Sequence, residues 1–99
     1  MPLFCFHCLD KKEGGAALRA RPRPAHLEWA VSLGDTVHMA GPLLAEDGET
    51  MIGSVFLVTA DSLAAARALS AQDPYTQAGV FGEVSIHEVR WSIGEGKPA

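Results

Sequence analysis

Two short runs of consecutive apolar residues limit the folds that this chain can adopt. Phe4, Cys5 and Phe6 form the first run, and residues 55–58 (Val-Phe-Leu-Val) form the second. Successive side chains of a β-strand point to opposite faces, so each of these strands is apolar on both faces. The helical segments of the chain suffice to cover one face of a sheet. We therefore expect the other face to be buried against a second copy of the chain, although short strands also tolerate an exposed valine or phenylalanine.

Helix signals occur in four segments: residues 16–21 for a turn or two, 24–33, 61 or 62 to about 72, and a short turn that starts at Asp73-Pro74. Pro24 suits the first turn of a helix, and Gly34 is a natural C-terminal stop. Either Asp61 or Ser62 can cap the Ala-rich helix that follows.

Strands are expected at residues 3–9, 36–40, 53–59 and 84–93. Gly41 and Pro42 should end the second strand, because proline cannot donate a hydrogen bond within a central strand. Residues 43–52 then form a long hairpin connection. The order of strand, helix, strand, strand, helix, strand predicts one ferredoxin-like α+β domain, βαββαβ.

The composition excludes several classes of protein. Apolar residues make up 47% of the chain and charged residues 20%, which is typical of a folded domain. The net charge is -4 and the basic residues are scattered except for Arg19, Arg21 and Arg23, so we expect no nucleic-acid partner. No apolar run approaches the roughly 20 residues that span a bilayer, and the N-terminus lacks the features of a secretory signal. We expect a cytoplasmic protein without a membrane partner.

Cys5 and Cys8 form a Cys-x-x-Cys pattern with His7 between them. In a strand, this odd spacing places the two thiols on opposite faces, and their Cα atoms lie about 10 Å apart. A disulfide needs less than about 7 Å. A zinc site would need two further ligands, and no second Cys or His pair supplies them. We therefore expect no metal at this segment.

His26 is the most promising candidate for chemistry. The first long helix is clearly polar only at Glu28 and Ser32, so His26 lies in its apolar arc and should face the sheet or a cleft. Asp73 falls nearly in line with the apolar residues of the second helix and should also point inward. In this fold the two helices run antiparallel, so the start of the first meets the end of the second.

His26 and Asp73 are therefore expected to be neighbours at one edge of the domain, where Gly41-Pro42, Gly53 and His7 should also lie. A carboxylate beside a histidine orients the imidazole and stabilises its charged form, which suits proton transfer. Alternatively, the two side chains merely satisfy each other and cap their helices. The spacing alone does not decide between these interpretations.

Other polar residues are weaker candidates. His38 and His87 lie in strands without a partner at a telling distance, and we interpret them as structural. Ser54 and Ser62 lack the Gly-x-Ser-x-Gly elbow of a serine nucleophile. Gly14-Gly15 lacks the strand, spacing and lysine of a phosphate-binding loop.

Several short motifs, in this order and spacing, resemble the YciI-like (YCII-related) family: Arg23-Pro24-Ala25-His26-Leu27, Ala40-Gly41-Pro42-Leu43, Gly53-Ser54, Asp73-Pro74-Tyr75 and Ala78-Gly79-Val80-Phe81. The resemblance covers nearly the whole chain and implies a single domain over residues 1–99, assembled as a dimeric α+β barrel. It also implies that His26 and Asp73 are the active-site pair. The doublet of Pro22 and Pro24 around Arg23 departs from the family pattern and leaves the role of Arg23 open.

Some YciI-like members are similar to elimination catalysts that act on chlorinated aromatic diols, and wider relatives include lactone isomerases. The resemblance therefore implies a cofactor-free acid/base enzyme of the lyase or isomerase type, acting on a small aromatic or lactone-like metabolite. We expect His26 and Asp73 to be catalytic, and Arg23, Gly41, Pro42 and Tyr75 to bind the substrate. The alternative is a non-catalytic dimeric module that binds a small metabolite or a protein. A cavity beside His26, lined by Tyr75, Phe81 or Trp29, would favour the enzyme.

Overall fold

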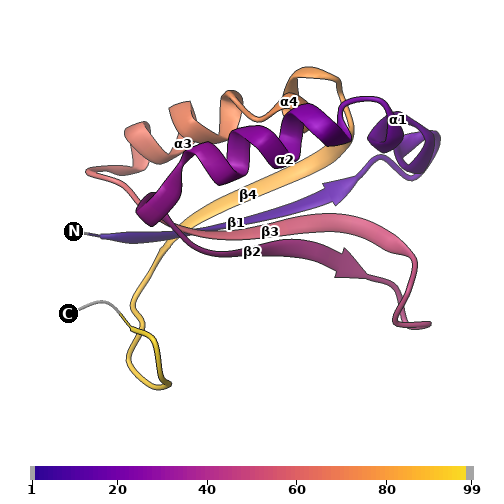
Figure 1. The fold of residues 1–99 in the computed structure, drawn as a ribbon. Coiled ribbons are helices and arrows are strands. Elements are labelled where there is room, and N and C mark those ends of the chain that lie inside the picture. Colours follow the sequence, from indigo (N-terminus) through magenta and orange to yellow (C-terminus); the bar gives the residue numbers. More distant parts are fainter. Residues whose placement is uncertain (1, 98–99) are drawn as a thin grey trace.

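The helices of this chain pack on one face of an antiparallel sheet (Figure 1). The computed structural model describes residues 2–97. In chain order its elements are β1 (Leu3–Asp10), α1 (Gly15–Ala20), α2 (Arg23–Ser32), the 3₁₀ turn η1 (Gly34–Thr36), β2 (Val37–Leu44), β3 (Met51–Thr59), α3 (Leu63–Ala71), α4 (Pro74–Gln77) and β4 (Phe81–Val89). The strand order β2-β3-β1-β4 confirms the ferredoxin-like α+β fold, with α1 and α4 as short additions.

The core lies between the sheet and the helices. Alternate residues of the two central strands, β1 and β3, are buried there: Phe4, Phe6, Cys8, Phe56 and Val58. Phe6 lies directly opposite Phe56 in the ladder, and their ring centroids are 6.0 Å apart. Burying a phenylalanine contributes roughly 1.5–3 kcal/mol, so the alternation in these two strands decides which face carries the helices.

Gly53 allows β1 and β3 to approach each other closely. A Cβ atom at this position would lie 2.2 Å from the carbonyl oxygen of Cys8 in β1. Because that oxygen belongs to the backbone, it could move aside only if the strand moved. Glycine is therefore required where the ladder passes beneath α1.

The predicted end of the second strand at Ala40 was wrong. Strand β2 continues through Gly41 and Pro42 to Leu44, and Pro42 pairs with Ser54. The reason is that β2 is an edge strand, where a residue without an N–H is tolerated. The connection to β3 is accordingly shorter than the predicted residues 43–52.

The tip of this hairpin is ordered by Asp47. Its carboxylate accepts hydrogen bonds from the backbone N–H groups of Glu49 and Thr50, both at 2.9 Å, and from the Thr50 hydroxyl. These bonds, chiefly those from Thr50, favour the charged form and lower the pKa of Asp47 to about 2.

The last strand was predicted at residues 84–93 but spans Phe81–Val89. Its start is set by pairing with β1, since Phe81 lies opposite Asp10. Its end is also set by β1, because Val89 pairs with Leu3, the first residue of that strand. Residues 90–93 therefore have no strand to pair with on this side.

The face of the sheet opposite the helices is called the open face here; it includes Cys5, His7, Leu9, Met39, Leu43, Val55, Leu57 and His87. Figure 1 shows no helix over it in residues 2–97. Cys5, Val55 and Leu57 form an apolar patch on its two central strands beside the exposed His7, and Met39 on the edge strand β2 is 50% exposed. Coverage of this face by a second copy stays a prediction.

Cys5 and Cys8 lie in strand β1, as predicted, on opposite faces of the sheet, and both are free thiols. Burial, followed by the nearby negative charges of Asp73 and Cys5, raises the pKa of Cys8 to about 12. Within residues 2–97, no three Cys, His, Asp or Glu side chains gather closely enough to hold a metal ion. The same residues include no helix with the length and hydropathy needed to cross a membrane.

Candidate active site

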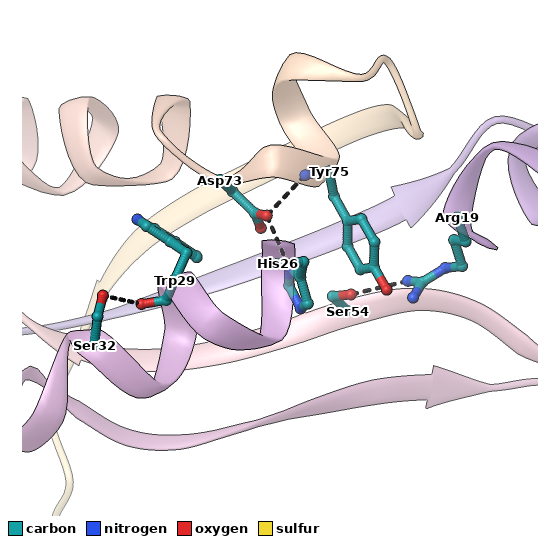
Figure 2. A network of polar contacts seen from close by, with 7 residues as sticks. All are labelled: Arg19, His26, Trp29, Ser32, Ser54, Asp73 and Tyr75. Carbon is teal, nitrogen blue, oxygen red and sulfur yellow. Dashed lines mark hydrogen bonds and ion pairs between the residues drawn. The ribbon is translucent and has the colours of Figure 1, made fainter. Parts of the chain in front are cut away.

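His26 in the first turn of α2 contacts Asp73, which lies in the chain between α3 and α4, as the topology predicts. The Nδ1 atom of His26 lies 2.7 Å from Oδ1 of Asp73, and the two residues are only 8% and 2% exposed. Asp73 is also the N-cap of α4, since the same oxygen accepts the backbone N–H of Tyr75 at 2.9 Å. One carboxylate thus fixes the start of α4 and the imidazole together (Figure 2).

This geometry defines the roles of the two imidazole nitrogens. An ionised carboxylate can only accept, so Nδ1 of His26 carries the proton that it donates to Asp73. In the neutral ring Nε2 is then an unprotonated acceptor on the other side of the imidazole. No protein group within residues 2–97 forms a hydrogen bond with Nε2. The imidazole is therefore oriented at one nitrogen and available for proton transfer at the other.

The ring of His26 is held flat against Tyr75. The centroids of the two rings are 3.8 Å apart, with an interplanar angle of 11°. The Phe56 ring contacts the imidazole in an edge-on arrangement, with the two centroids 5.8 Å apart. The guanidinium carbon of Arg19 lies 4.7 Å from the Tyr75 centroid. Figure 2 shows Tyr75 between His26 and Arg19. This stack prevents the imidazole from turning away from Asp73.

A cavity of about 220 Å³ borders the stack. Its polar lining comes from Arg19, Arg23, His26, Ser54 and Tyr75, and its apolar wall includes Leu27, Ala30, Val31, Gly41, Pro42 and Phe56. Val31 is 79% exposed, so the cavity reaches the surface along α2. All four predicted substrate-binding residues therefore line the same space as His26. Of the three aromatic residues considered for this cavity, Tyr75 lines it, whereas Trp29 and Phe81 do not.

Arg23 and the pair Gly41-Pro42 contribute differently to the cavity. Arg23 is exposed at the first position of α2, with Nη1 3.7 Å from Sδ of Met51. Gly41 and Pro42 present little side-chain bulk from the edge strand β2. The mouth of the cavity thus has one positively charged side chain, Arg23, and is open on the side of Gly41 and Pro42.

The sequence reasoning missed a second polar group in the cavity. Arg19 in α1 is 7% exposed; its Nε donates to Oδ2 of Asp10, and its Nη2 donates to Oγ of Ser54 at 2.8 Å. The positions of Ser54 and Asp10 were predictable, because each lies an even number of residues from the buried core residues of its own strand and so points to the same face. The position of Arg19 was not predictable, since only tertiary contacts bring its short helix against β3.

The remaining histidines lie away from this site. His7 was expected at the same edge but belongs to the open face, because it alternates with the buried Phe6 and Cys8. His38 is exposed and contacts the Thr59 hydroxyl through Nε2, and His87 is exposed on β4. Ser62 caps α3, accepting from the backbone N–H of Ala65 at 3.1 Å.

Known proteins resemble this chain over most of its length. A family model described as the YCII-related domain matches residues 3–90. The proteins named Protein YciI from Escherichia coli and from Shigella flexneri are each 34% identical over 91 residues, which cover 85% of this chain and 92% of the relative.

Two solved structures resemble the fold. One is the 5-chloro-2-hydroxyhydroquinone dehydrochlorinase TftG from Burkholderia phenoliruptrix in complex with 2,5-dihydroxybenzoquinone, with a TM-score of 0.77 and 25% identity over 97% of this chain and 99% of TftG. The other, from Arabidopsis thaliana, has a TM-score of 0.50 and 11% identity over 96% of this chain and 99% of its own, and shows the fold alone. The family model spans nearly all of the strands and helices, and the two YciI proteins are identical to this chain at a third of the aligned residues. The chain therefore belongs to the YCII-related domain family.

Proposed function

We propose that this protein is a cofactor-free acid/base enzyme of the lyase or isomerase type, acting on a small oxygenated ring compound, either aromatic or lactone-like. His26 transfers the proton and Asp73 orients it. One observation carries the proposal: His26 is fixed at Nδ1 by a buried carboxylate while the same ring lines a cavity that reaches the surface.

Asp73 has a definite part in this chemistry. When Nε2 takes a proton, the imidazole becomes positively charged, and the Asp73 carboxylate at 2.7 Å stabilises that charge. It also holds Nδ1 in the protonated form, so that Nε2 is the basic nitrogen. An asparagine could accept one hydrogen bond in its place but would supply no charge.

The likeness to TftG supports a particular reaction. TftG is a dehydrochlorinase of a hydroxylated, chlorinated ring, and this chain covers 99% of it. In an analogous step, the substrate is the keto tautomer of a chlorinated ring polyol, whose chlorine-bearing carbon is tetrahedral. His26 takes a hydroxyl proton, the O–H electron pair forms a carbonyl as the ring double bonds shift, and chloride leaves with the C–Cl pair. The net change is loss of HCl, which consumes no oxidant.

The other predicted residues take part in binding. Tyr75 contributes to the lining of the cavity between His26 and Arg19, and Gly41 and Pro42 leave room for a substrate ring on the side of the edge strand. Arg23 at the mouth supplies a positive charge to an approaching anionic group.

The test compares the wild type with His26→Gln and Asp73→Asn, using His87→Gln, an exposed histidine on β4, as the matched control. Chloride release from 5-chloro-2-hydroxyhydroquinone is measured under anaerobic conditions, together with a thermal-shift screen of small ring metabolites. We expect His26→Gln to lower turnover by at least about a hundredfold, which is the typical contribution of a general acid or base. Asp73→Asn should lower turnover less, and His87→Gln should leave it unchanged.

Full turnover by the folded His26→Gln variant would exclude the catalytic assignment. A specific ligand that shifts the melting temperature of the wild type without being converted would favour the alternative, a non-catalytic module that binds a small metabolite.

A further inference from the structure

The end of the cavity at Arg19 has hydrogen-bonding capacity that the protein itself does not use. Oγ of Ser54 accepts a hydrogen bond from Arg19 at 2.8 Å, so the Ser54 proton must point elsewhere, and no group within residues 2–97 accepts it. The hydroxyl of Tyr75 is enclosed and has no partner among these residues. Buried hydroxyl groups are normally paired, so the unpaired Tyr75 hydroxyl and the unused donor capacity of Ser54 beside a cavity need an explanation.

Arg19 determines what kind of group fits there. Asp10 accepts a hydrogen bond from Nε of Arg19 and so anchors the guanidinium group. The two terminal nitrogens, Nη1 and Nη2, do not take part in this bond and can donate to other groups. One of these, Nη2, bonds Ser54 and makes that hydroxyl a stronger donor, because hydrogen bonds in a chain polarise one another. The unpaired Oδ1 of Asp10 does not belong to the cavity lining. The groups that do line this end therefore offer protons, and they favour an oxygen that accepts several hydrogen bonds over one that donates.

The position of Arg19 and Ser54 relative to His26 indicates what this end of the cavity can do. Tyr75 separates the two polar groups, with His26 stacked at 3.8 Å from its centroid and the Arg19 guanidinium carbon at 4.7 Å (Figure 2). His26, Tyr75, Arg19 and Ser54 all line the one cavity. A small ring in this cavity can thus present one oxygen to Arg19 and Ser54 while a different position of the ring faces the imidazole.

We propose that Arg19, Ser54 and Tyr75 form an oxyanion-binding subsite, and that the substrate is a small ring compound held there by an ionised oxygen. This inference rests on the proposed function, since it names the substrate class of the same site. It assigns to Ser54 the role of a donor to the substrate, and to Asp10 that of a positioning residue that acts through Arg19.

The test measures binding of three probes at pH 7 by calorimetry. They are 2,5-dihydroxybenzoquinone, whose ring oxygens are ionised, benzoate, whose charge lies on a carboxylate, and hydroquinone, a ring of similar size that is neutral. The variants are Ser54→Ala and Tyr75→Phe, which remove only the hydroxyl. Ser70→Ala, at a buried serine of α3 that does not line the cavity, is the matched control.

We expect the wild type to bind an ionised probe more tightly than hydroquinone. Each of the two site variants should weaken binding of the ionised probe about tenfold or more, as expected for a lost hydrogen bond to a charged group, and leave hydroquinone within about twofold. Because its hydroxyl is unpaired in the free protein, Tyr75→Phe should melt no lower than the wild type. A preference for benzoate over the quinone would place the charge on a carboxylate.

Wild-type protein that shows no preference for either ionised probe would overturn the inference, as would folded Ser54→Ala and Tyr75→Phe variants that retain full preference. His26→Gln separates this result from the proposed function. It should lose turnover but keep the preference for the ionised probe, because the imidazole does not belong to the oxyanion subsite.

Discussion

The imidazole of His26 has little freedom, because a carboxylate holds one nitrogen and two aromatic rings hold its face and edge. This burial bears on how variants of the pair are interpreted. An exposed catalytic pair can be removed at little cost in stability, whereas a buried one leaves its partner unsatisfied. Loss of stability and loss of activity are therefore both expected here, and only ligand binding and turnover separate a functional pair from a structural one.

The two cysteines are expected to differ in reactivity. The pKa of Cys8 is raised to about 12, so at pH 8 its thiol is protonated and buried, whereas Cys5 is half-buried on the open face. In folded protein dilute enough to be monomeric, so that the open face is not covered, a thiol reagent should therefore modify one thiol; after denaturation it should modify two. Cys5→Ser should abolish the fast reaction. Fast modification of that variant at pH 8 would show that Cys8 is not shielded.

The same pKa predicts a loss of stability in alkali. Below pH 9 the Cys8 thiol is protonated in both the folded and the unfolded chain, so it contributes no dependence on pH. Between pH 9 and about 12 the unfolded chain releases the proton and the folded chain retains it. Unfolding becomes more favourable over this range, and Cys8→Ala should reduce the slope of stability against pH.

At the scale of secondary-structure elements, the spacing between β1 and β3 determines where the site can form. Ser54 follows Gly53 directly and points to the helix face, so the close approach of the two strands at Gly53 also sets the height of Ser54 beneath Arg19. The central strand β3 thus contributes Ser54 and Phe56 to the cavity, the edge strand β2 contributes Gly41 and Pro42, and the helices supply most of the other side chains.

Gly53→Ala should lower the free energy of unfolding by roughly 2–4 kcal/mol, because the added methyl group meets backbone that can move only with the strand. Gly41→Ala is the matched control, since a Cβ there has no atom within 4 Å. Urea unfolding of both variants measures the difference. Equal stability of the two variants would contradict the close contact with the Cys8 carbonyl oxygen.

How much of the structure the sequence predicts depends on how local the signal is. Strands β1 and β3 and helices α2 and α3 were predicted within a few residues, because their apolar spacing and capping residues lie inside the elements. The ends of β2 and β4 were wrong, since they depend on edge position and on the partner strand. His26 and Asp73 were found through topology, whereas Arg19 was missed because its contacts to Asp10 and Ser54 are set only by tertiary packing.

At the scale of the whole molecule, the sheet has two unequal faces. The helices cover one, and the apolar centre of the open face stays in contact with solvent in a single chain. Apolar surface of this kind usually marks an interface between proteins. The family resemblance implies the same face-to-face association as a dimeric barrel.

We predict a homodimer through the open face. Light scattering at micromolar concentration should give twice the 10.5 kDa mass of one chain. Leu57→Lys, at the centre of the open face, should shift the protein toward the monomer, whereas Leu63→Lys, at a leucine of the helix layer that is 38% exposed, should not. A wild-type mass of 10.5 kDa at this concentration would contradict the predicted interface.

The edges of the sheet affect how such an assembly could grow. Pro42 interrupts the row of N–H donors that a further strand would need along β2, and β4 carries Glu83 and Glu88 along the opposite edge. Proline and charged side chains on edge strands discourage pairing between sheets. Copies of this chain can then associate through faces but not through a continuing ladder, so assembly is expected to stop at a closed particle instead of extending into a fibre.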